Sequence, residues 1–570
     1  DRAKDLDISE RDLKADSIIL CSFGDASANH ATALSAFNTA GWVSNSGGHV
    51  PIIFICEDNG TGISVPTNEH WIEQNFSNRP RLQYVQTDGL HLIDLMIKSR
   101  RVEHDCRIDR SPIFLHMKTV RLMGHAGSDV EVGYKSLQDI EATEFNDPLL
   151  HSARILIENN CLSSEEIIHL YEGIGDQVSH VFEAATLRPK LESAQDVMES
   201  ITANQSSKKS PKQPTKKTRQ NLFGKEFNRM DQPYHMAKLI NYTLSDIMLR
   251  YKNTVVFGED VAQKGGVYHL TADLYKQFGV RRVFNSPLDE TSIIGFGMGF
   301  GHNGFVPIPE IQFLAYLHNA EDQLRGEAAT LPFFSDGQFT NPMVLRVPGL
   351  AYQKGFGGHF HNDNSLTIFR DIPGIILAVP SNGADASKMI RTAVREAHEN
   401  GRIIVFVEPI ALYMTKDLHE PKDGKWTFKY PVLDEEIPVG KFAEYGKGKV
   451  LTLITYGNGL YLSLQAKKEI EKKLKKKIKI IDLRWLSEMN IPKLLNAIGT
   501  SNNILIVDEC RRTGCHGEGL FAQLVSESKK PLNIKLHAAE DSFISIGVAA
   551  TVTLPSKDSI IKNALELVNG

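Results

Sequence analysis

Two turns in the first part of the sequence have the residue types and the spacing of a metal site. Asp25 follows an apolar run at 17–23, and Asn59 lies 34 positions later, after a second apolar run at 50–57. In open parallel sheets, ligands bind at the carboxyl ends of the strands, where turns of this kind lie. A carboxylate, an amide oxygen and a backbone carbonyl are hard ligands that suit Mg²⁺, which completes its shell with phosphate oxygens. Taken alone, the pattern fits ordinary strand-end turns about equally well.

Further candidates for chemistry lie in the second half. Glu290 stands in PLDETS, directly before a glycine-rich segment, where a carboxyl group flanked by apolar residues could take part in proton transfer. The alternative, an acid favoured by the dipole at a helix N-terminus, suits the preceding residue better. In EIQFLAYL, Tyr316 on its own residue type fits a core position, and Glu310 is interpreted as structural. His359 and His361 lie in YQKGFGGHFHNDNS, and packing rarely explains a glycine-rich stretch with two histidines.

The elements that would position the first two turns form a βαβ pattern. Residues 17–23 and 50–57 are apolar and strand-like, and the small residues at 30–42 between them are typical of a helix. This order predicts a parallel sheet covered by helices. A further strand is expected at 111–121, and helices are expected from 163 to 198, where SSEE gives a capping pattern.

A second alternation of helices and strands begins near residue 233. Its helices are expected at 233–251 and 292–304, and the glycines of the latter would let a neighbour approach closely. Its strands are expected at 253–260, 341–349 and 402–409.

A third unit should follow from about residue 436. Its strands are expected at 449–459, 477–486 and 503–510. In the lysine-rich run between the first two of these, Ile470, Leu474 and Ile478 lie four apart, which predicts a surface helix with one apolar stripe rather than an anion site.

Residues 203–222 differ from everything around them. They are polar, basic and proline-containing, with almost no apolar side chains, so they cannot bury enough surface to fold. We expect a flexible linker there, because the segment lies between two folded units, although its composition also fits a basic docking tail.

The bulk composition limits the class of protein. A chain of 570 residues should form about three or four domains, and its net charge of −5 suggests neither nucleic acid nor an anionic membrane as a partner. No apolar run is long enough to span a bilayer. The 6 cysteines lack the spacing of a zinc site or a redox pair, which favours reduced thiols in the cytoplasm.

The first pair of turns resembles the thiamine-diphosphate fingerprint GDG…N. The resemblance implies that the side chains of Asp25 and Asn59 and the carbonyl of Thr61 bind Mg²⁺ and the cofactor. The chain departs from the fingerprint at Ala26, where glycine is usual, and at Asp58, where asparagine is common. Ala26 should cost little if its φ is negative, whereas Asp58 adds negative charge near the diphosphate.

The second half resembles the beta subunit of the decarboxylase component of 2-oxo acid dehydrogenases, of the pyruvate and branched-chain type, and the resemblance is close throughout 255–323. It implies that Glu290 contacts the aminopyrimidine nitrogen of thiamine diphosphate and that Tyr316 stacks on the pyrimidine ring. His361 would be the active-site histidine, with His359 as a neighbour.

The segment TVRLMGHAGSDVEVGY resembles the loop that the alpha subunit of the same family lays over the diphosphate. The resemblance implies that Arg121 and His125 contact the cofactor. In this family a long segment precedes the Gly-Asp motif, whereas 23 residues precede Gly24 here. We therefore expect the amino-terminal part of the alpha region to be missing.

The implied fold class is α/β, with two thiamine-diphosphate-binding parallel-sheet domains followed by a transketolase C-terminal-type α/β domain. The expected segments are a partial alpha-type diphosphate and Mg-binding domain at 1–202, the basic linker at 203–222, a beta-type pyrimidine-binding domain at 223–435, and the C-terminal domain at 436–570.

The implied function is thiamine-diphosphate-dependent oxidative decarboxylation of a 2-oxo acid, with Glu290, His361 and His125 as catalytic residues. The acyl group would pass to a lipoyl group on a partner dihydrolipoyl acyltransferase, which makes the chain a lipoamide-dependent 2-oxo acid dehydrogenase. A homodimer equivalent to a heterotetramer is expected, without a nucleic-acid or membrane partner. Two other hypotheses stay open: a transketolase-like ketol transferase with a sugar-phosphate pocket, and a non-catalytic assembly subunit that does not bind the cofactor.

Overall fold

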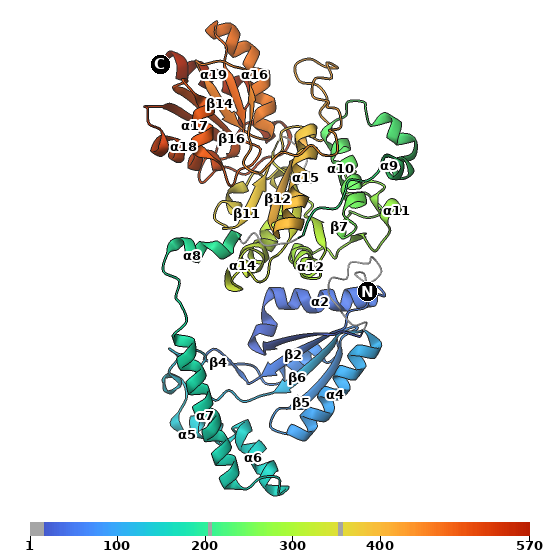
Figure 1. The fold of residues 1–570 in the computed structure, drawn as a ribbon, viewed down its shortest axis with the longest axis vertical. Coiled ribbons are helices and arrows are strands. Elements are labelled where there is room, and N and C mark those ends of the chain that lie inside the picture. The colour runs from blue at the N-terminus through green and yellow to red at the C-terminus, as the bar shows by residue number, and fades with distance from the viewer. Residues whose placement is uncertain (1–15, 203–207, 352–356) are drawn as a thin grey trace. The chain divides into compact units, whose positions relative to one another are not determined.

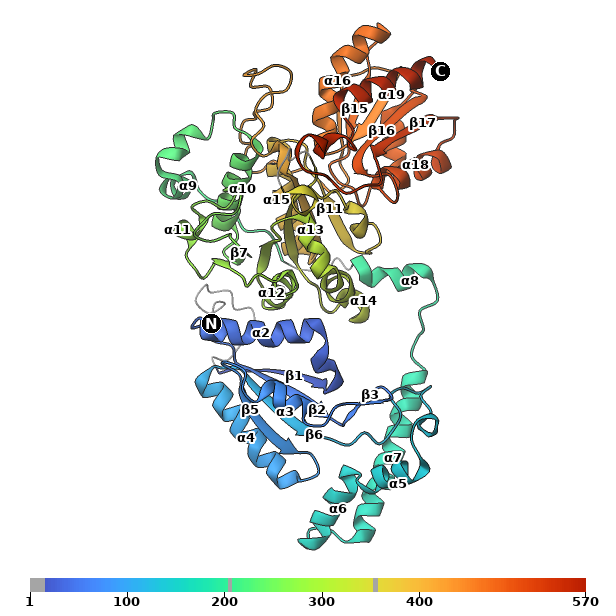
Figure 2. The same cartoon turned by 180° about the vertical axis from the view of Figure 1, so that it is seen from behind.

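The computed structural model describes residues 16–202, 208–351 and 357–570 (Figures 1 and 2). The described residues fall into two compact units, which divide between Glu192 and Ser193. Each unit is an α/β structure with its own parallel sheet and core.

The first unit contains a four-stranded parallel sheet in the order β1-β2-β6-β5. Its strands are β1 (Ile19–Gly24), β2 (Ile52–Asp58), β5 (Gln83–Asp88) and β6 (Ile113–Lys118). Helices α2 (Ala31–Asn45) and α3 (Trp71–Phe76) pack on one face through a cluster of phenylalanines, and α4 (Leu92–Asp109) packs on the other. The predicted βαβ pattern and the strand at 111–121 are confirmed.

Three helices follow this sheet: α5 (Leu137–Phe145), α6 (Pro148–Glu158) and α7 (Ser164–Thr186). Helix α7 begins with a capping box, in which Ser163 and Glu166 each bind the backbone amide of the other residue. The predicted helix start at SSEE is therefore confirmed. The next helix, α8 (Ala194–Glu199), belongs to the second unit, so the boundary between the units comes before residue 202.

The second unit begins with a six-stranded parallel sheet in the order β11-β12-β10-β9-β7-β8. Its strands are β7 (Thr254–Gly258), β8 (Val283–Asn285), β9 (Val306–Glu310), β10 (Met343–Gly349), β11 (Ile375–Ala378) and β12 (Ile403–Pro409). Helices α10 (Met236–Arg250) and α15 (Gly383–Asn400) cover one face. The other face carries α12 (Glu290–His302) and α13 (Leu314–Leu317), and the two faces can be followed in Figures 1 and 2.

Helix α12 lies close to the start of β10, as its glycines predict. A Cβ atom on Gly297 would lie 2.9 Å from the methyl carbon of Met343, and one on Gly301 would lie 3.0 Å from the Pro342 ring. An alanine at Gly297 would require the flexible end of the Met343 side chain to move, whereas an alanine at Gly301 would meet the rigid Pro342 ring.

The C-terminal domain has five strands in the order β13-β15-β14-β16-β17, with β13 antiparallel to its neighbour. They are β13 (Ala443–Tyr445), β14 (Thr452–Thr455), β15 (Lys479–Asp482), β16 (Asn503–Arg511) and β17 (Asn533–Ala539). Helices α16 (Asn458–Leu474) and α19 (Lys557–Asn569) cover one face, and α17 (Ile491–Ile498) and α18 (His516–Glu527) cover the other. The second face shares its core with the domain of the six-stranded sheet, which joins the two domains in one unit.

The predicted lysine-rich helix is confirmed only in part. Helix α16 ends at Leu474, where Lys475 takes a left-handed conformation with φ of 50°. Ile470 is buried on the helix, but Ile478 lies beyond its end, directly before β15, and is buried there. The four-residue spacing of apolar residues therefore extends beyond the end of the helix. Ile478 is apolar because it is buried at the start of the following strand, and not because it lies on the helix.

The prediction of a flexible linker is wrong for the described residues 208–222. Helix α9 (Lys216–Phe223) occupies part of this range, and Arg219 makes an ion pair with the buried Asp246 at 2.7 Å. Ser210 donates to Glu399 at 2.6 Å. A few polar side chains thus bind specific partners on the folded unit, which composition does not reveal. Residues 203–207 of the expected linker lie outside the described residues.

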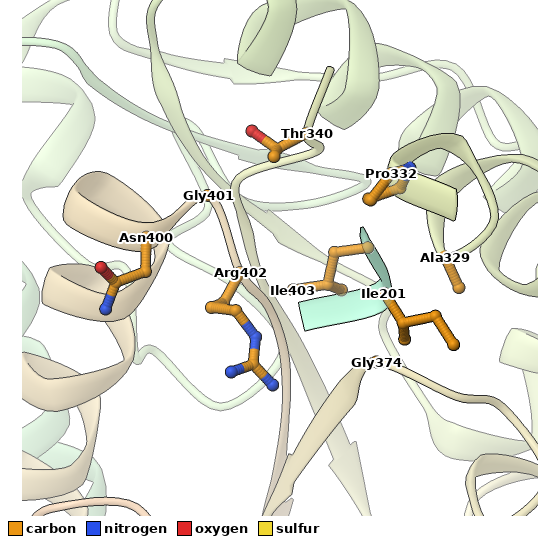
Figure 3. A pocket seen from close by; sticks show the side chains of 9 residues that line it. All are labelled: Ile201, Ala329, Pro332, Thr340, Gly374, Asn400, Gly401, Arg402 and Ile403. Carbon is orange, nitrogen blue, oxygen red and sulfur yellow. The ribbon is translucent and has the colours of Figure 1, made fainter. Parts of the chain in front are cut away.

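Directly before the expected linker, Ile201 lines a shallow hollow on the second unit (Figure 3). Ile201, from the short helix η3 (Ser200–Thr202), lines it together with Gly374, Arg402 and Ile403. The latter three residues lie at the amino-terminal ends of β11 and β12. This hollow is therefore at the edge of the sheet opposite to the carboxyl ends, where ligands bind in α/β proteins.

Within the described parts of the chain, no helix combines the length and the apolar character that crossing a membrane requires.

Candidate functional site

In the first unit, the structure brings together the two turns that the sequence singled out. Strands β1 and β2 are neighbours, with Gly24 opposite Glu57, so Asp25 and Asn59 leave the sheet side by side at its carboxyl edge. Asp25 is buried, and its Oδ2 accepts a hydrogen bond from Thr67 Oγ1 at 2.5 Å. The Asn59 side chain accepts from the backbone amide of Thr61 at 3.0 Å, which fixes its turn.

The segment after Asn59 folds back onto the turn after β1. Thr61 and Gly62 form a short strand, β3 (Thr61–Gly62), that pairs with β4 (Val65–Pro66). A Cβ atom on Gly62 would lie 2.7 Å from Cβ of Ala26, so glycine is required on one side of this contact. Ala26 begins a 3₁₀ helix, and its φ is not positive. The condition set for a low cost of alanine is therefore met, and the close approach places the need for glycine at residue 62.

The donors at this edge fit a hard divalent cation. Asp25 Oδ1 accepts no hydrogen bond from the described residues, and Asn59 Oδ1 accepts only the Thr61 amide. Among the described residues, no group of three or more His, Cys, Asp or Glu side chains could hold a metal ion. A cation here would therefore depend on one carboxylate together with amide and carbonyl oxygens, a set that suits Mg²⁺ with phosphate oxygens in its remaining positions.

Asp58, the departure from the fingerprint, is neutralised by its own protein partners. His116 Nε2 lies 2.7 Å from Asp58 Oδ2, Lys118 Nζ donates to the same oxygen, and the Gly60 amide donates to Oδ1 at 3.1 Å. Burial by itself would raise the pKa of Asp58, but these hydrogen bonds and the Lys118 charge hold it well below its usual range. His116 is in turn held by Tyr84, whose hydroxyl lies 2.6 Å from Nδ1. Neighbouring groups therefore offset the negative charge expected near the diphosphate.

Arg121 and His125 lie on the chain that follows β6. The backbone amide of His125 donates to Asp129 Oδ2 at 2.6 Å, and Tyr134 donates to the same oxygen at 2.8 Å. Arg121 donates to the Tyr134 hydroxyl at 3.2 Å, so Asp129 and Tyr134 link the two residues. The hydrogen bonds of the described residues do not connect Arg121 or His125 to the Asp25 turn. The His125 side chain is exposed and available to a ligand.

In the second unit, Glu290 is the first residue of α12. The preceding Asp289 caps the helix by accepting from the Ser292 amide at 3.1 Å. The Glu290 carboxylate does not serve this cap, and its Oε2 accepts from Asn319 Nδ2 at 3.3 Å. The acid with the simple helix-dipole explanation is thus Asp289, and Glu290 remains available to a ligand.

A second carboxyl group, Glu259, lies near Glu290 and was not assigned from the sequence. It follows β7 at the carboxyl edge of the sheet, and it is half-buried. Burial, together with the nearby charges of Glu290, Asp260 and Glu310, raises the pKa of Glu259 to about 7. The only signal in the sequence was that the strand NTVVFGED ends in acidic residues.

Aromatic side chains connect this carboxyl pair with the active-site histidine expected from the sequence. The Tyr316 ring lies 6.3 Å from the His361 ring, and the Phe313 ring lies 4.5 Å from it. Glu259 and Glu290 are close enough to Tyr316 for their charges, added to its burial, to raise its pKa. Glu290, Tyr316 and His361 therefore lie in one cluster.

The two histidines of this stretch face different neighbours. The His359 ring lies 5.0 Å from the ring of Phe543 in the C-terminal domain, whereas His361 lies against the aromatic pair described above. Residues 352–356 of the same glycine-rich stretch lie outside the described residues.

Glu310 has the structural role predicted for it. Arg346, which is completely buried, donates to Glu310 at 2.6 Å and to Glu408 at 2.7 Å. This ion group lies inside the sheet, beneath the carboxyl edge, and its members are satisfied by one another.

Two parallel sheets that present acids at their carboxyl edges, one of them beside aromatic rings and a histidine, define a ligand-binding α/β enzyme. The comparisons with known proteins agree. The family described as "Dehydrogenase E1 component" matches residues 3–194, "Transketolase, pyrimidine binding domain" matches 232–414, and "Transketolase, C-terminal domain" matches 440–543.

Similar curated proteins include "Pyruvate dehydrogenase E1 component subunit beta" from Staphylococcus epidermidis, 31% identical over 338 residues, which cover 58% of this chain and 97% of the relative. The protein of the same name from Bacillus subtilis is 30% identical over 346 residues, covering 58% of this chain and 98% of the relative. A solved structure titled "Split gene transketolase, inactive beta4 tetramer" aligns with a TM-score of 0.46 and 16% identity, over 59% of this chain and 99% of that chain.

The chain belongs to the family of thiamine-diphosphate-dependent 2-oxo acid dehydrogenase E1 components, with an alpha-type and a beta-type region in one polypeptide. It is thus an oxidoreductase of the 2-oxo acid dehydrogenase type. The predicted family and fold class are confirmed.

Proposed function

We propose that this protein decarboxylates a 2-oxo acid with thiamine diphosphate and Mg²⁺ and transfers the acyl product to a lipoyl group on a partner acyltransferase. The observation that carries the proposal is the cluster of Glu290, Tyr316 and His361 at the carboxyl edge of the beta-type sheet. Family membership supplies the reaction type.

Glu290 would hold the pyrimidine ring of the cofactor by sharing a proton with a ring nitrogen. The neighbouring Glu259 favours this role. Because its pKa is about 7, a large fraction of Glu259 carboxyl groups is uncharged near neutral pH, and Glu290 then has one fewer negative neighbour. Tyr316 would stack on the pyrimidine face, and Asn319 would keep the Glu290 carboxylate oriented.

Asp25, Asn59 and the carbonyl of Thr61 would hold Mg²⁺, and with it the diphosphate. Arg121 and His125 would add positive charge and hydrogen-bond donors to the diphosphate. The thiazolium ring of the bound cofactor supplies the electron sink that makes loss of carbon dioxide feasible.

His361 would donate a hydrogen bond to the substrate carboxylate or to the alkoxide that develops on its carbonyl oxygen. The aromatic rings of Phe313 and Tyr316 lie beside it and would restrict the orientation of the imidazole. His125, on the alpha-type region, would serve the same substrate or the lipoyl group. A homodimer, equivalent to a heterotetramer of separate alpha and beta subunits, is part of this proposal.

The test measures cofactor binding and catalysis separately. Thiamine diphosphate is titrated calorimetrically into the chain with and without Mg²⁺, and dye-coupled oxidation is followed with pyruvate and with 3-methyl-2-oxobutanoate. We expect Mg²⁺-dependent binding, and we expect Glu290→Gln to lower the turnover number by at least about a hundredfold. Glu527→Gln, which changes an exposed carboxylate in α18 in the same way, should leave both unchanged.

The two alternatives predict different results. A ketol transferase would bind the cofactor and transfer two-carbon units between sugar phosphates, but it would not acylate a lipoyl domain. A non-catalytic assembly subunit would fail to bind thiamine diphosphate at any Mg²⁺ concentration. Either result would contradict the proposal.

A further inference from the structure

The stretch that carries His361 is held by the carboxyl end of β16, on the C-terminal domain. Asn364 Nδ2 donates to the Glu509 carbonyl at 2.7 Å, and Arg511 Nη1 donates to Asn364 Oδ1 at 3.1 Å. The end of this strand therefore holds the chain directly after His361.

Asp363 is the central group of this attachment. It is buried, its Oδ1 lies 3.3 Å from Arg511 Nη2, and its Oδ2 lies 3.5 Å from His318 Nε2. The Ser365 hydroxyl donates to the same carboxylate. Burial alone would raise the pKa of Asp363, but His318, Ser365 and Arg511 together lower it. A buried carboxylate that keeps its charge needs such partners, and Arg511 is the permanently charged one.

The attachment continues to the residues around Glu290. His318, which contacts Asp363, is followed by Asn319, whose side chain donates to Glu290. Through Asp363, the histidine stretch is thus tied both to the C-terminal domain and to the turn that holds Glu290.

A β-bulge directs Arg511 toward this stretch. The pairing of β16 with β17 shifts register between Val507 and Arg511. Asp508 fixes the irregular segment by accepting from the amides of Cys510 at 2.9 Å and Gly517 at 2.8 Å. Bulges commonly re-aim side chains beside active sites.

We propose that Arg511, acting through Asp363, is a positioning residue for His361. It touches neither substrate nor cofactor; it holds the imidazole in register with Tyr316 and Glu290. This inference rests on the proposed function, in which His361 contacts the substrate.

The experiment compares Arg511→Gln, Asp363→Asn and the double variant with the wild-type chain, using pyruvate and 3-methyl-2-oxobutanoate in the dye-coupled assay. Rates are expressed per chain with bound thiamine diphosphate, so that loss of folded protein does not count as loss of catalysis. Arg511→Lys tests rescue by a conservative change, and Arg512→Gln, at the exposed neighbouring position, is the matched control.

We expect each single variant to lower kcat by about 10- to 100-fold, as small displacements of a catalytic group do. KM should change little, because the substrate is bound by other groups. The double variant should be no slower than the slower single variant, since both changes break one interaction. Arg511→Lys should recover part of the rate, and Arg512→Gln should match the wild type.

Two results would overturn the inference alone: an active wild-type chain whose Arg511→Gln variant is equally fast, or losses in the two single variants that multiply in the double variant. A wild-type chain that binds the cofactor but oxidises neither 2-oxo acid would overturn the proposed function, and this inference with it.

Discussion

Glu509 should make the protein less stable as the pH rises. This carboxyl group lies at the bulge of β16, is buried, and accepts one side-chain hydrogen bond, from Asn458 Nδ2 at 2.9 Å. Burial raises its pKa from the ordinary 4.5 to about 8, although the hydrogen bond from Asn458 opposes the increase. The folded protein therefore holds this proton more tightly than the unfolded chain does.

The sign and size of the effect follow from linkage. Below pH 4.5 the carboxyl group is protonated in both states, so its favourable contribution is fully present. Between 4.5 and about 8 the unfolded chain releases the proton and the folded protein does not, which costs about 1.4 kcal/mol of stability per pH unit. Between pH 5 and pH 8 the loss is about 4 kcal/mol.

The assay compares the thermal unfolding of the wild-type chain and of Glu509→Gln at several pH values from 5 to 8.5. Glutamine removes the ionisation, so across this range the melting temperature of the second unit should rise by about 5 °C in the variant relative to the wild type, because a unit of this size has an unfolding entropy of about 0.8 kcal/mol/K. Glu527→Gln, on the exposed side of α18, should follow the wild type at every pH. A constant difference between Glu509→Gln and the wild type would refute the reasoning, because the effect would then come from packing alone.

Three further changes should have defined results. Gly62→Ala should weaken Mg²⁺-dependent thiamine diphosphate binding by about 10- to 100-fold in calorimetry, because its Cβ would collide with Ala26; adding Ala26→Gly should restore binding, and failure to do so would contradict the packing argument. Arg346→Leu should lower the unfolding free energy by about 3–5 kcal/mol in urea titrations, since two buried glutamates lose their cation; an unchanged midpoint would contradict it. Lys118→Met should cost about 1 kcal/mol at pH 7, because Lys118 is half-exposed. Since its partner carboxylate has a lowered pKa, this cost should shrink as the pH falls below 4; a cost independent of pH would exclude the ion pair as its cause.

Local patterns predicted much of the fold. Apolar runs predicted β1 and β2, and the SSEE pattern predicted the start of α7. These predictions were possible because strands and helix caps depend on residues that are consecutive in the sequence. Strand β5 was missed, since its sequence QYVQTD is polar and only Thr87 in it is buried. It is a strand because it pairs with β6, which local composition does not record.

In the candidate site, too, local sequence revealed some residues and could not reveal others. Asp25 and Glu290 could be found because each stands beside a turn or a glycine-rich segment in the sequence. The His116 partner of Asp58 is 58 positions away, and Arg511 is 148 positions from Asp363. Such pairs depend on strand order and on a bulge, and one sequence contains no direct record of either.

The connection between the two units has a consequence for how the protein is made and used. The relatives named above are separate beta subunits, whereas here the chain runs from one unit to the other at Glu192–Ser193, and Ile201 and Ser210 fasten the next segment to the second unit. Every translated molecule therefore carries the alpha-type and beta-type regions in a one-to-one ratio. Dilution that would separate a two-chain enzyme leaves this ratio unchanged, and neither region needs its own gene to be expressed in balance with the other.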